Sequence, residues 1–395
     1  MQFAECFSIR AGEIYTEQGI LKDHWLLVEQ QKIVAIGREP HIDWPQFDFP
    51  SLKMVPGMID LHIHGRDGFD IMDGTDEAID AISASLAKFG VTGFLGTTVT
   101  AKWDVTLEAY QAIGRARERK LPGAKILGAY NEGLFFSEAQ KGAHNEKFFL
   151  PLTQERIDAI IDASKGSLKM FALAPELEDN MAMIPYLVEK NVVPMLGHTN
   201  ANHEQTKEAL RLGACGGVHV FNGMKGIHHR DPGCAGTLLM DKKALVEVIA
   251  DGIHLHPLIM QMVLQLKGEE KVALISDCIN AGGLADGQYR LGELDIVVEH
   301  GVARTLTNSL AGSTLTLNKA VKNMVELADV SFARAINMAT SSPAKHIQLQ
   351  ESVGSIAVGK FADLVLMAED CSVHGTIIDG KLCYHSPQLS TFISE

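Results

Sequence analysis

The chain has 395 residues, of which 46 % are hydrophobic, and a formal net charge of -14 at pH 7. This length is enough for one large α/β domain and a smaller second domain, and the acidic balance argues against nucleic acid and anionic membranes as partners. The six cysteines show no CxxC spacing, the first segment lacks an apolar signal core, and no apolar run approaches the roughly 20 residues of a membrane span. We therefore expect a soluble cytoplasmic protein.

The two ends of the chain share one character, short strand-like pieces broken by turns. Near the start these are HWLLVEQ and KIVAIG, and near the end they are GSIAVGKFADLVLM and TIIDGKLCYH. Neither end has enough apolar sequence to fold alone. We expect residues 1–54 and 346–395 to form one small β-sandwich domain beside a catalytic domain of residues 55–345.

Between the two ends, eight short apolar runs alternate with helix-like segments. The runs are VPGMIDLHIHG, VTGFLGTTVT, ILGAYNEG, MFALAPEL, VVPMLGHT, GVHVFNGM, LVEVIADGIH and KVALISDCI. Segments such as EAIDAISASLAKFG and ANHEQTKEALRLGA repeat apolar residues at three- and four-residue spacing, which is typical of amphipathic helices. Eight strand–helix units predict a parallel (β/α)8 TIM barrel, with a doubly wound open sheet as the alternative.

Most of these runs carry a polar residue at the carboxyl end. In a closed barrel these ends meet at one mouth, whereas an open sheet would leave the pattern unexplained. His62 and His64 in HIHG also share one face of their strand, because side chains alternate along a strand. The residues expected at the mouth are His62, His64, Glu132, His198, His219, His254 and Asp277.

The imidazoles and carboxylates in this group are ligand types for zinc or another first-row divalent ion. Singly, each has a structural explanation: Glu132 could cap a helix, His198 and His219 could be core histidines, and Asp277 could pair with a neighbour. Together at one barrel mouth they favour a metal site of one or two ions. Zinc is the first candidate, and Fe²⁺, Mn²⁺ and Co²⁺ fit the same ligands.

This arrangement resembles the amidohydrolase superfamily, whose barrels hold one or two divalent ions in this pattern. The fourth run, MFALAPEL, has no lysine at its carboxyl end, and Lys169 lies at its beginning. A carbamylated lysine bridge is therefore not expected. Glu132 is the natural bridging or sole acidic ligand.

Five further motifs resemble the family of N-acetylglucosamine-6-phosphate deacetylases. They are NEGLFFSEAQKGAHN, MLGHTNA, GGVHVFNGMKGIHHRDPG, IADGIHLHP and LAGSTLTL. The resemblance implies metal ligation by Glu132, His198 and His219, a second ion at His62 and His64 approached by Asp277, and catalysis by Asp277 and His254. The substrate-binding residues that it implies are Ala143, His144, Asn222, Gly223, Arg230, His254, Leu310, Ala311 and Gly312.

The resemblance also implies a reaction, hydrolysis of N-acetyl-D-glucosamine 6-phosphate to D-glucosamine 6-phosphate and acetate. A bound divalent ion lowers the pKa of water from about 15.7 to around 7, and Asp277 would take the proton as base and return it to the amine. His254 would stabilise the oxyanion, and Arg230 would grip the phosphate. A homodimer is implied, in which the Arg230 loop reaches the neighbouring subunit's site.

The chain departs from the family after the third strand, where the usual Glu-Gly-Pro turn is Glu132, Gly133 and Leu134. Loss of the proline removes a fixed φ, which puts substrate preference in question more than catalysis. Two alternatives stay open: deacetylation of N-acetylgalactosamine 6-phosphate, and a non-catalytic sugar-phosphate-binding protein of the same fold.

Overall fold

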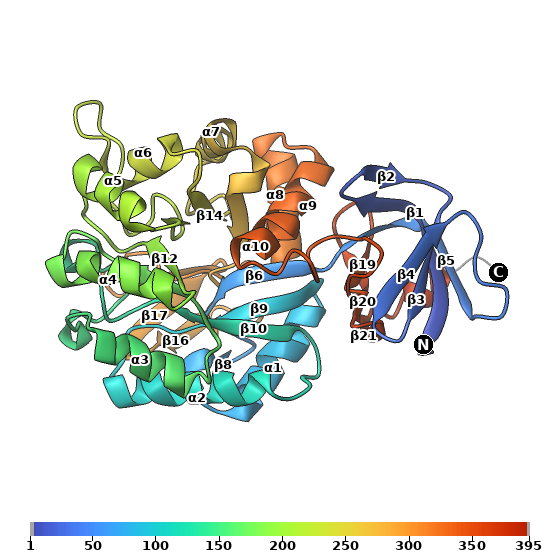
Figure 1. Cartoon of the computed structure of the whole chain (residues 1–395), viewed down its shortest axis with the longest axis horizontal. Coiled ribbons are helices and arrows are strands. Elements are labelled where there is room, and N and C mark those ends of the chain that lie inside the picture. Colours follow the sequence, from blue (N-terminus) through green and yellow to red (C-terminus); the bar gives the residue numbers. More distant parts are fainter. Residues whose placement is uncertain (1–3, 393–395) are drawn as a thin grey trace.

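The computed structural model describes residues 4–392, which form a barrel and, beside it, a β-domain built from both ends of the chain (Figure 1). The barrel sheet has eight parallel strands. In sheet order they are β6 (Met58–Ile63), β9 (Val91–Thr97), β10 (Lys125–Asn131), β11 (Leu168–Leu173), β12 (Val193–Leu196), β13 (Gly216–Gly217), β14 (Leu245–Ile249) and β15 (Val272–Ile275).

The ring closes between the first and last of these strands. Ile63 forms a parallel bridge with Cys278, the Asp277 amide donates to the His62 carbonyl at 2.9 Å, and the His64 amide donates to the Cys278 carbonyl at 2.9 Å. The predicted (β/α)8 barrel is therefore confirmed, and the open-sheet alternative is wrong.

Helices surround the barrel, as the periodic segments predict. They are α1 (Asp76–Ala87), α2 (Trp103–Arg117), α3 (Gln154–Ala163), α4 (Glu178–Glu189), α5 (His203–Leu212), α6 (Gly233–Met240), α7 (Pro257–Lys267), α8 (Leu317–Ala328), α9 (Phe332–Ala339) and α10 (Ser341–His346). Local chemistry sets their ends: α5 begins at a capping box of Asn202 and Gln205 and ends at the left-handed Gly213. In the described part of the chain, no helix combines the length and the apolar content that crossing a bilayer requires.

The sixth barrel strand is much shorter than the run GVHVFNGM predicts. Pairing is limited to Gly216–Gly217, because the backbone turns into left-handed conformations at His219 (φ 26°) and Phe221 (φ 77°). A Cβ atom on Gly216 would lie 2.2 Å from the Leu245 carbonyl oxygen. Only glycine allows the neighbouring strand to approach this closely.

The terminal β-domain contains one mixed eight-stranded sheet. Its strands are β1 (Cys6–Thr16), β2 (Gly19–Leu21), β3 (Trp25–Glu29), β4 (Lys32–Gly37), β5 (Gln46–Pro56), β19 (Leu364–Met367), β20 (Val373–Ile378) and β21 (Lys381–His385). Antiparallel pairing of β19 with β5 joins the two ends of the chain. The fold class is as predicted, while the proposed domain boundaries at residues 54 and 346 stay predictions.

The floor of the barrel, where the strands begin, faces this terminal domain. The Lys125 ammonium at the start of β10 lies 2.9 Å from the Asp363 carboxylate and 2.6 Å from the Asp379 carboxylate. The Thr376 hydroxyl also donates to the Ala87 carbonyl of α1 at 2.7 Å. These contacts fix the barrel against the terminal sheet.

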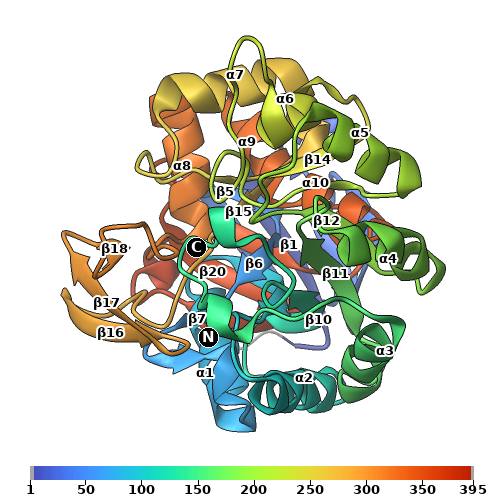
Figure 2. The ribbon, with the colours of Figure 1, turned by 90° about the vertical axis from the view of Figure 1, so that its left-hand side faces the viewer.

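The mouth faces the opposite way, toward the viewer in Figure 2. An antiparallel sheet that the sequence did not predict lies at its rim, between β15 and α8: β16 (Gly287–Leu291), β17 (Leu294–Glu299) and β18 (Val302–Thr305). A short hairpin of β7 (Gly65–Arg66) and β8 (Phe69–Asp70) follows β6. The rim sheet packs on its own apolar cluster, which includes Ala311 and Leu291.

Candidate metal centre and active site

A cavity of about 360 Å³ opens at the barrel mouth. The predicted residues that line it are His64, Glu132, Ala143, His144, His198, His219, Asn222, Gly223, His254, Asp277, Leu310 and Gly312. His62 lies below them and is fully buried, and Ala311 is buried in the rim sheet cluster. Arg230 is exposed and is not among the residues lining the cavity of its own chain.

Three of the polar side chains enter the cavity from the same position relative to their strands. His198, His219 and Asp277 each stand two residues beyond the last residue of β12, β13 and β15. All three have positive φ angles, of 46°, 26° and 49°. Left-handed backbone is costly for residues with a Cβ and gathers at functional sites, so the chain turns sharply there and aims these side chains inward.

The Glu132 carboxylate, directly after β10, separates the histidines into two pairs. Its Oε1 atom lies 2.9 Å from Nε2 of His219 and 3.1 Å from Nε2 of His198. Its Oε2 atom lies 3.1 Å from Nε2 of His64 and 3.4 Å from Nε2 of His62. Each carboxylate oxygen therefore faces its own pair of imidazole nitrogens.

The other ring nitrogen of each histidine has a fixed acceptor. Because these acceptors are carbonyls or a carboxylate, every Nδ1 carries a hydrogen, and every Nε2 faces Glu132, the position of a ligating nitrogen. The pairs are His62 with the Glu247 carboxylate (3.1 Å), His64 with the Thr97 carbonyl (3.2 Å), His198 with the Gln140 carbonyl (3.0 Å) and His219 with the Asn222 carbonyl (3.0 Å).

The carboxylate of Asp277 lies next to the two histidines of HIHG. Its Oδ1 atom lies 3.2 Å from Nε2 of His64 and 3.6 Å from Nε2 of His62. Ligands about 2.0–2.1 Å from a tetrahedral zinc ion stand about 3.4 Å from one another, close to the spacings found here. Donor atoms close enough to share one ion form three overlapping groups: His62, His64 and Asp277; His62, Glu132 and His219; and Glu132, His144 and His198. The donor set thus fits a divalent ion.

The close packing of imidazoles and carboxylates sets the protonation of His64 and Asp277 in the metal-free protein. Burial alone would lower the pKa of His64, but hydrogen bonds to Asp277 and Glu132 outweigh it and raise that pKa to about 9. Burial would likewise raise the pKa of Asp277, yet its hydrogen bond to His64 and the charges of nearby histidines lower it to about 2. Protons on the imidazoles thus balance the carboxylates, and an ion would have to displace them.

Two further histidines face the cavity, and Nε2 of one of them, His144, lies 3.7 Å from Oε2 of Glu132. His254 donates through Nδ1 to Oδ2 of Asp251 at 2.6 Å, which leaves its Nε2 for a substrate. Nδ1 of His144 lies 2.8 Å from the Thr100 hydroxyl. Burial, and then the neighbouring charge of His198, hold the pKa of His144 well below its usual value. His144 is therefore a neutral hydrogen-bonding group.

The sequence and the overall fold are similar to those of known proteins. The model of the amidohydrolase family matches residues 54–383, which is most of the chain and includes every side chain described above. The chain belongs to the amidohydrolase family. Two curated relatives of this amidohydrolase are nearly equally similar to it. One is an N-acetylglucosamine-6-phosphate deacetylase of Vibrio furnissii, 41 % identical over 84 % of this chain and 83 % of the relative. The other is an N-acetylgalactosamine-6-phosphate deacetylase of Escherichia coli O157:H7, 40 % identical over 95 % of this chain and 98 % of the relative.

Solved structures resemble this amidohydrolase over almost its whole length. One is a mutant N-acetyl-D-glucosamine-6-phosphate deacetylase of Mycobacterium smegmatis in complex with N-acetyl-D-glucosamine 6-phosphate, with a TM-score of 0.90, 31 % identity and coverage of 96 % of this chain and 100 % of that one. The deacetylase of Pasteurella multocida gives a TM-score of 0.91 at 26 % identity, with the same coverage. Barrel and terminal domain are thus both part of the resemblance.

Leu134 stands where the family usually has proline, and the backbone of this amidohydrolase excludes proline at that position. Leu134 has a φ of 69°, which proline cannot adopt because its ring fixes φ near −65°. Its amide also donates to the Thr100 hydroxyl at 3.0 Å, and proline has no such hydrogen. Since Thr100 also contacts His144, the substitution connects the turn after Glu132 to a side chain of the cavity.

Two acidic residues next to the site were missed by the sequence analysis of this amidohydrolase. Glu247 lies within β14 in the apolar run LVEVI and is fully buried. A carboxylate inside an otherwise apolar strand indicates a buried polar partner, and this could have identified Glu247 from the sequence. Asp251 stands two residues beyond β14, the position that carries a polar side chain after three other strands. That regularity could have found it.

Proposed function

We propose that this amidohydrolase removes the acetyl group of N-acetyl-D-glucosamine 6-phosphate by hydrolysis, giving D-glucosamine 6-phosphate and acetate. The observation that carries the proposal is the placement of Asp277 and His254 in one cavity with the Glu132 carboxylate and its histidines. The names of the relatives in Vibrio and Mycobacterium support the substrate class. Free cysteines and a phosphorylated substrate support a cytoplasmic location.

In this proposal the two sides of Glu132 hold divalent ions. His198 and His219 with Oε1 would hold one, and His62 and His64 with Oε2 and the approaching Asp277 would hold a second. When bound, such an ion makes water a stronger nucleophile and polarises a carbonyl. The sequence and the donor atoms fit zinc first, and iron, manganese or cobalt also.

The chain's own residues move the protons. Asp277, at the cavity wall, accepts a proton from the attacking water and delivers it to the departing amine nitrogen. His254, held by Asp251, faces the acetyl carbonyl and stabilises the negative charge that develops on its oxygen. Ala143, His144, Asn222, Gly223 and the loop of Leu310 to Gly312 enclose the sugar.

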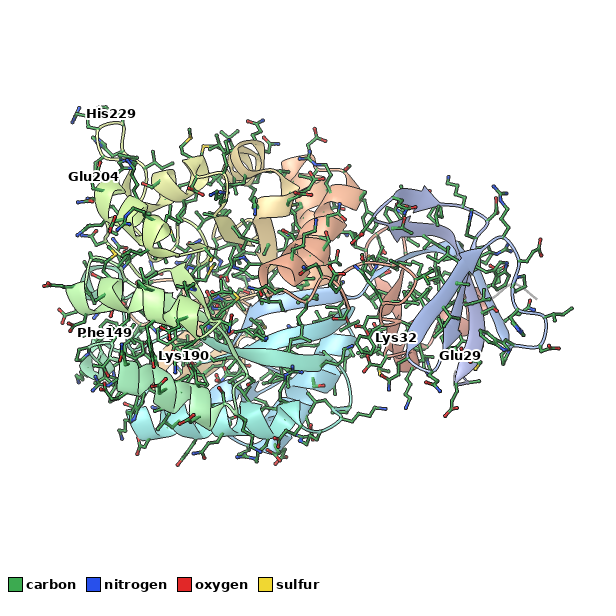
Figure 3. The ribbon with its side chains drawn as sticks, viewed as in Figure 1. Glu29, Lys32, Phe149, Lys190, Glu204 and His229 are labelled. Atoms are coloured by element: carbon green, nitrogen blue, oxygen red, sulfur yellow. The ribbon has the colours of Figure 1, made fainter. Side chains whose placement is uncertain are left out.

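Arg230 does not line the cavity of its own chain, so its proposed role in binding phosphate requires a second subunit. Its loop projects from the barrel rim beyond α5, with His229 at the outer end in Figure 3, and the Arg230 guanidinium donates to Nε2 of the neighbouring His229 at 2.6 Å. Ile227 beside it is 50 % exposed. We propose a homodimer in which this loop reaches the partner's cavity and binds the phosphate.

Acetate release by the metal-loaded protein tests the reaction. We expect a higher kcat/KM with N-acetylglucosamine 6-phosphate than with the galactosamine isomer, and Asp277→Asn should lower kcat by roughly 10²- to 10⁴-fold while the sugar phosphate still binds. The opposite ratio would assign the activity named for the Escherichia relative. Binding without turnover in either case would favour the sugar-phosphate-binding alternative.

Mixing two inactive variants tests the shared site. If Arg230 serves the partner, Asp277→Asn and Arg230→Gln chains that exchange subunits should recover activity, because one cavity of each mixed dimer has both residues intact. A mixture that stays as inactive as its components would remove Arg230 from the neighbouring site.

A further inference from the structure

A second set of cavities lies at the other end of the barrel, between the floor and the terminal β-domain. One, of about 290 Å³, is lined by residues that follow α2 and by β21. It shares Lys120, Lys381 and Cys383 with a wider cavity of about 760 Å³. None of these residues lines the active-site cavity at the mouth.

The inner cavity gathers positive charge. Arg117, Lys120 and Lys381 all line it, from the end of α2, the loop after it and the first residue of β21. Among residues 4–392, none of these three side chains has a carboxylate within ion-pair distance. All three residues are exposed to solvent. They form a local cationic group in a chain whose net charge is -14.

The other charged groups of this wall are already paired. Arg119 donates to Asp80 at 2.6 Å. Lys125 forms ion pairs with both Asp363 and Asp379, so the Asp379 carboxylate already has a cationic partner. In the outer cavity, Glu5 is the acidic residue of the lining.

Lys120 and Lys381 act on each other directly. The Lys381 ammonium is the main cause that lowers the pKa of Lys120, with burial next. Both ammonium groups line the same two cavities, where like charges repel. An anion placed between them would turn this repulsion into two charge-assisted hydrogen bonds.

We propose that this cavity is a second binding site, for a small phosphate monoester or inorganic phosphate, held by Lys120 and Lys381 with Arg117 beside them. The dianion matches two ammonium groups that line one cavity, and the guanidinium adds a donor suited to phosphate oxygens. The space of about 290 Å³ is that of a small-molecule pocket. Because Lys120 belongs to the barrel and Lys381 to the terminal sheet, the bound anion joins the two domains.

Counting bound phosphate tests the proposal. Equilibrium dialysis of the purified holoenzyme against radiolabelled inorganic phosphate should give one more equivalent per chain than the variant Lys120→Gln with Lys381→Gln. Phosphate held at the active site is common to both proteins and cancels. Loss of two charge-assisted bonds should weaken binding at this site by about a hundredfold.

A matched variant controls for charge alone. Lys207→Gln with Lys242→Gln removes two exposed lysines that line neither cavity, and it should bind as much phosphate as the parent. In phosphate-free buffer the Lys120 and Lys381 variant should melt at the parent's temperature or above, because repulsion has been removed. Equal phosphate uptake by that variant and the parent, or an equal loss in the Lys207 and Lys242 control, would overturn the proposal.

Discussion

The exchange Glu247→Gln should weaken binding of one metal ion and spare the other. Glu247 is fully buried and accepts the Nδ1 hydrogen of His62 at 3.1 Å. The backbone amide of His219 donates to the same carboxylate at a longer 3.4 Å, a bond that the amide oxygen of glutamine can still accept. Glutamine keeps the shape and an acceptor oxygen but loses the charge, and a neutral hydrogen bond is about half as strong. Changing such a partner of a metal-ligating histidine costs roughly 10- to 100-fold in affinity, or about 1.4 to 2.7 kcal/mol.

The assay is metal content at buffered free Zn²⁺ concentrations, measured by elemental analysis after gel filtration. The parent should fill two sites per chain, and Glu247→Gln should fill the second only at 10- to 100-fold higher free zinc. Glu108→Gln, on the exposed face of α2, is the matched control and should behave as the parent. If Glu247→Gln filled both sites at the same free zinc concentrations as the parent, the role given to Glu247 would be refuted. Equal weakening of both sites would also refute it.

Three further outcomes follow from the site. Asp251→Asn removes the carboxylate that holds His254 at 2.6 Å, and steady-state kinetics should show kcat reduced about 10- to 100-fold with KM nearly unchanged; a change in KM alone would contradict this. Zinc binding at pH 7.5 should release protons, because His64 has a pKa of about 9 without metal and must be neutral to ligate; calorimetry in buffers of different ionisation heat measures this, and equal heats would argue against it. Leu134→Pro should lower stability by more than about 1 kcal/mol, seen as a lower melting temperature, since proline fits neither the φ of 69° nor the hydrogen bond to Thr100. An unchanged melting curve would show that the turn can rearrange.

The barrel and its mouth could be read from the sequence because two simple rules apply. Parallel strands covered by helices give continuous apolar runs, and closure brings their carboxyl ends together. The residues that end these runs, such as Glu132 and His198, therefore meet in space although 66 positions separate them. The strand-end residues that line the cavity follow from this regularity: His64, Glu132, His198, His219, His254 and Asp277. The other predicted lining residues, such as His144 and Asn222, were implied by the family resemblance alone.

Features that depend on packing could not be read in the same way. The rim sheet of β16 to β18 has short, partly exposed strands whose alternation is weak. The division of histidines between the two oxygens of Glu132 depends on side-chain rotamers, and the support of His62 by Glu247 joins residues on β6 and β14. The placement of Lys120 and Lys381 in one cavity likewise depends on how the two domains meet, which no local sequence pattern predicts.

Hydrolysis in water enriched in oxygen-18 tests the central claim most directly. If water attacks the acetyl carbonyl with Asp277 moving its proton, mass spectrometry of the products should find one labelled oxygen in acetate and none in the glucosamine 6-phosphate. Label in inorganic phosphate, or no labelled acetate from either N-acetylhexosamine 6-phosphate, would contradict the account.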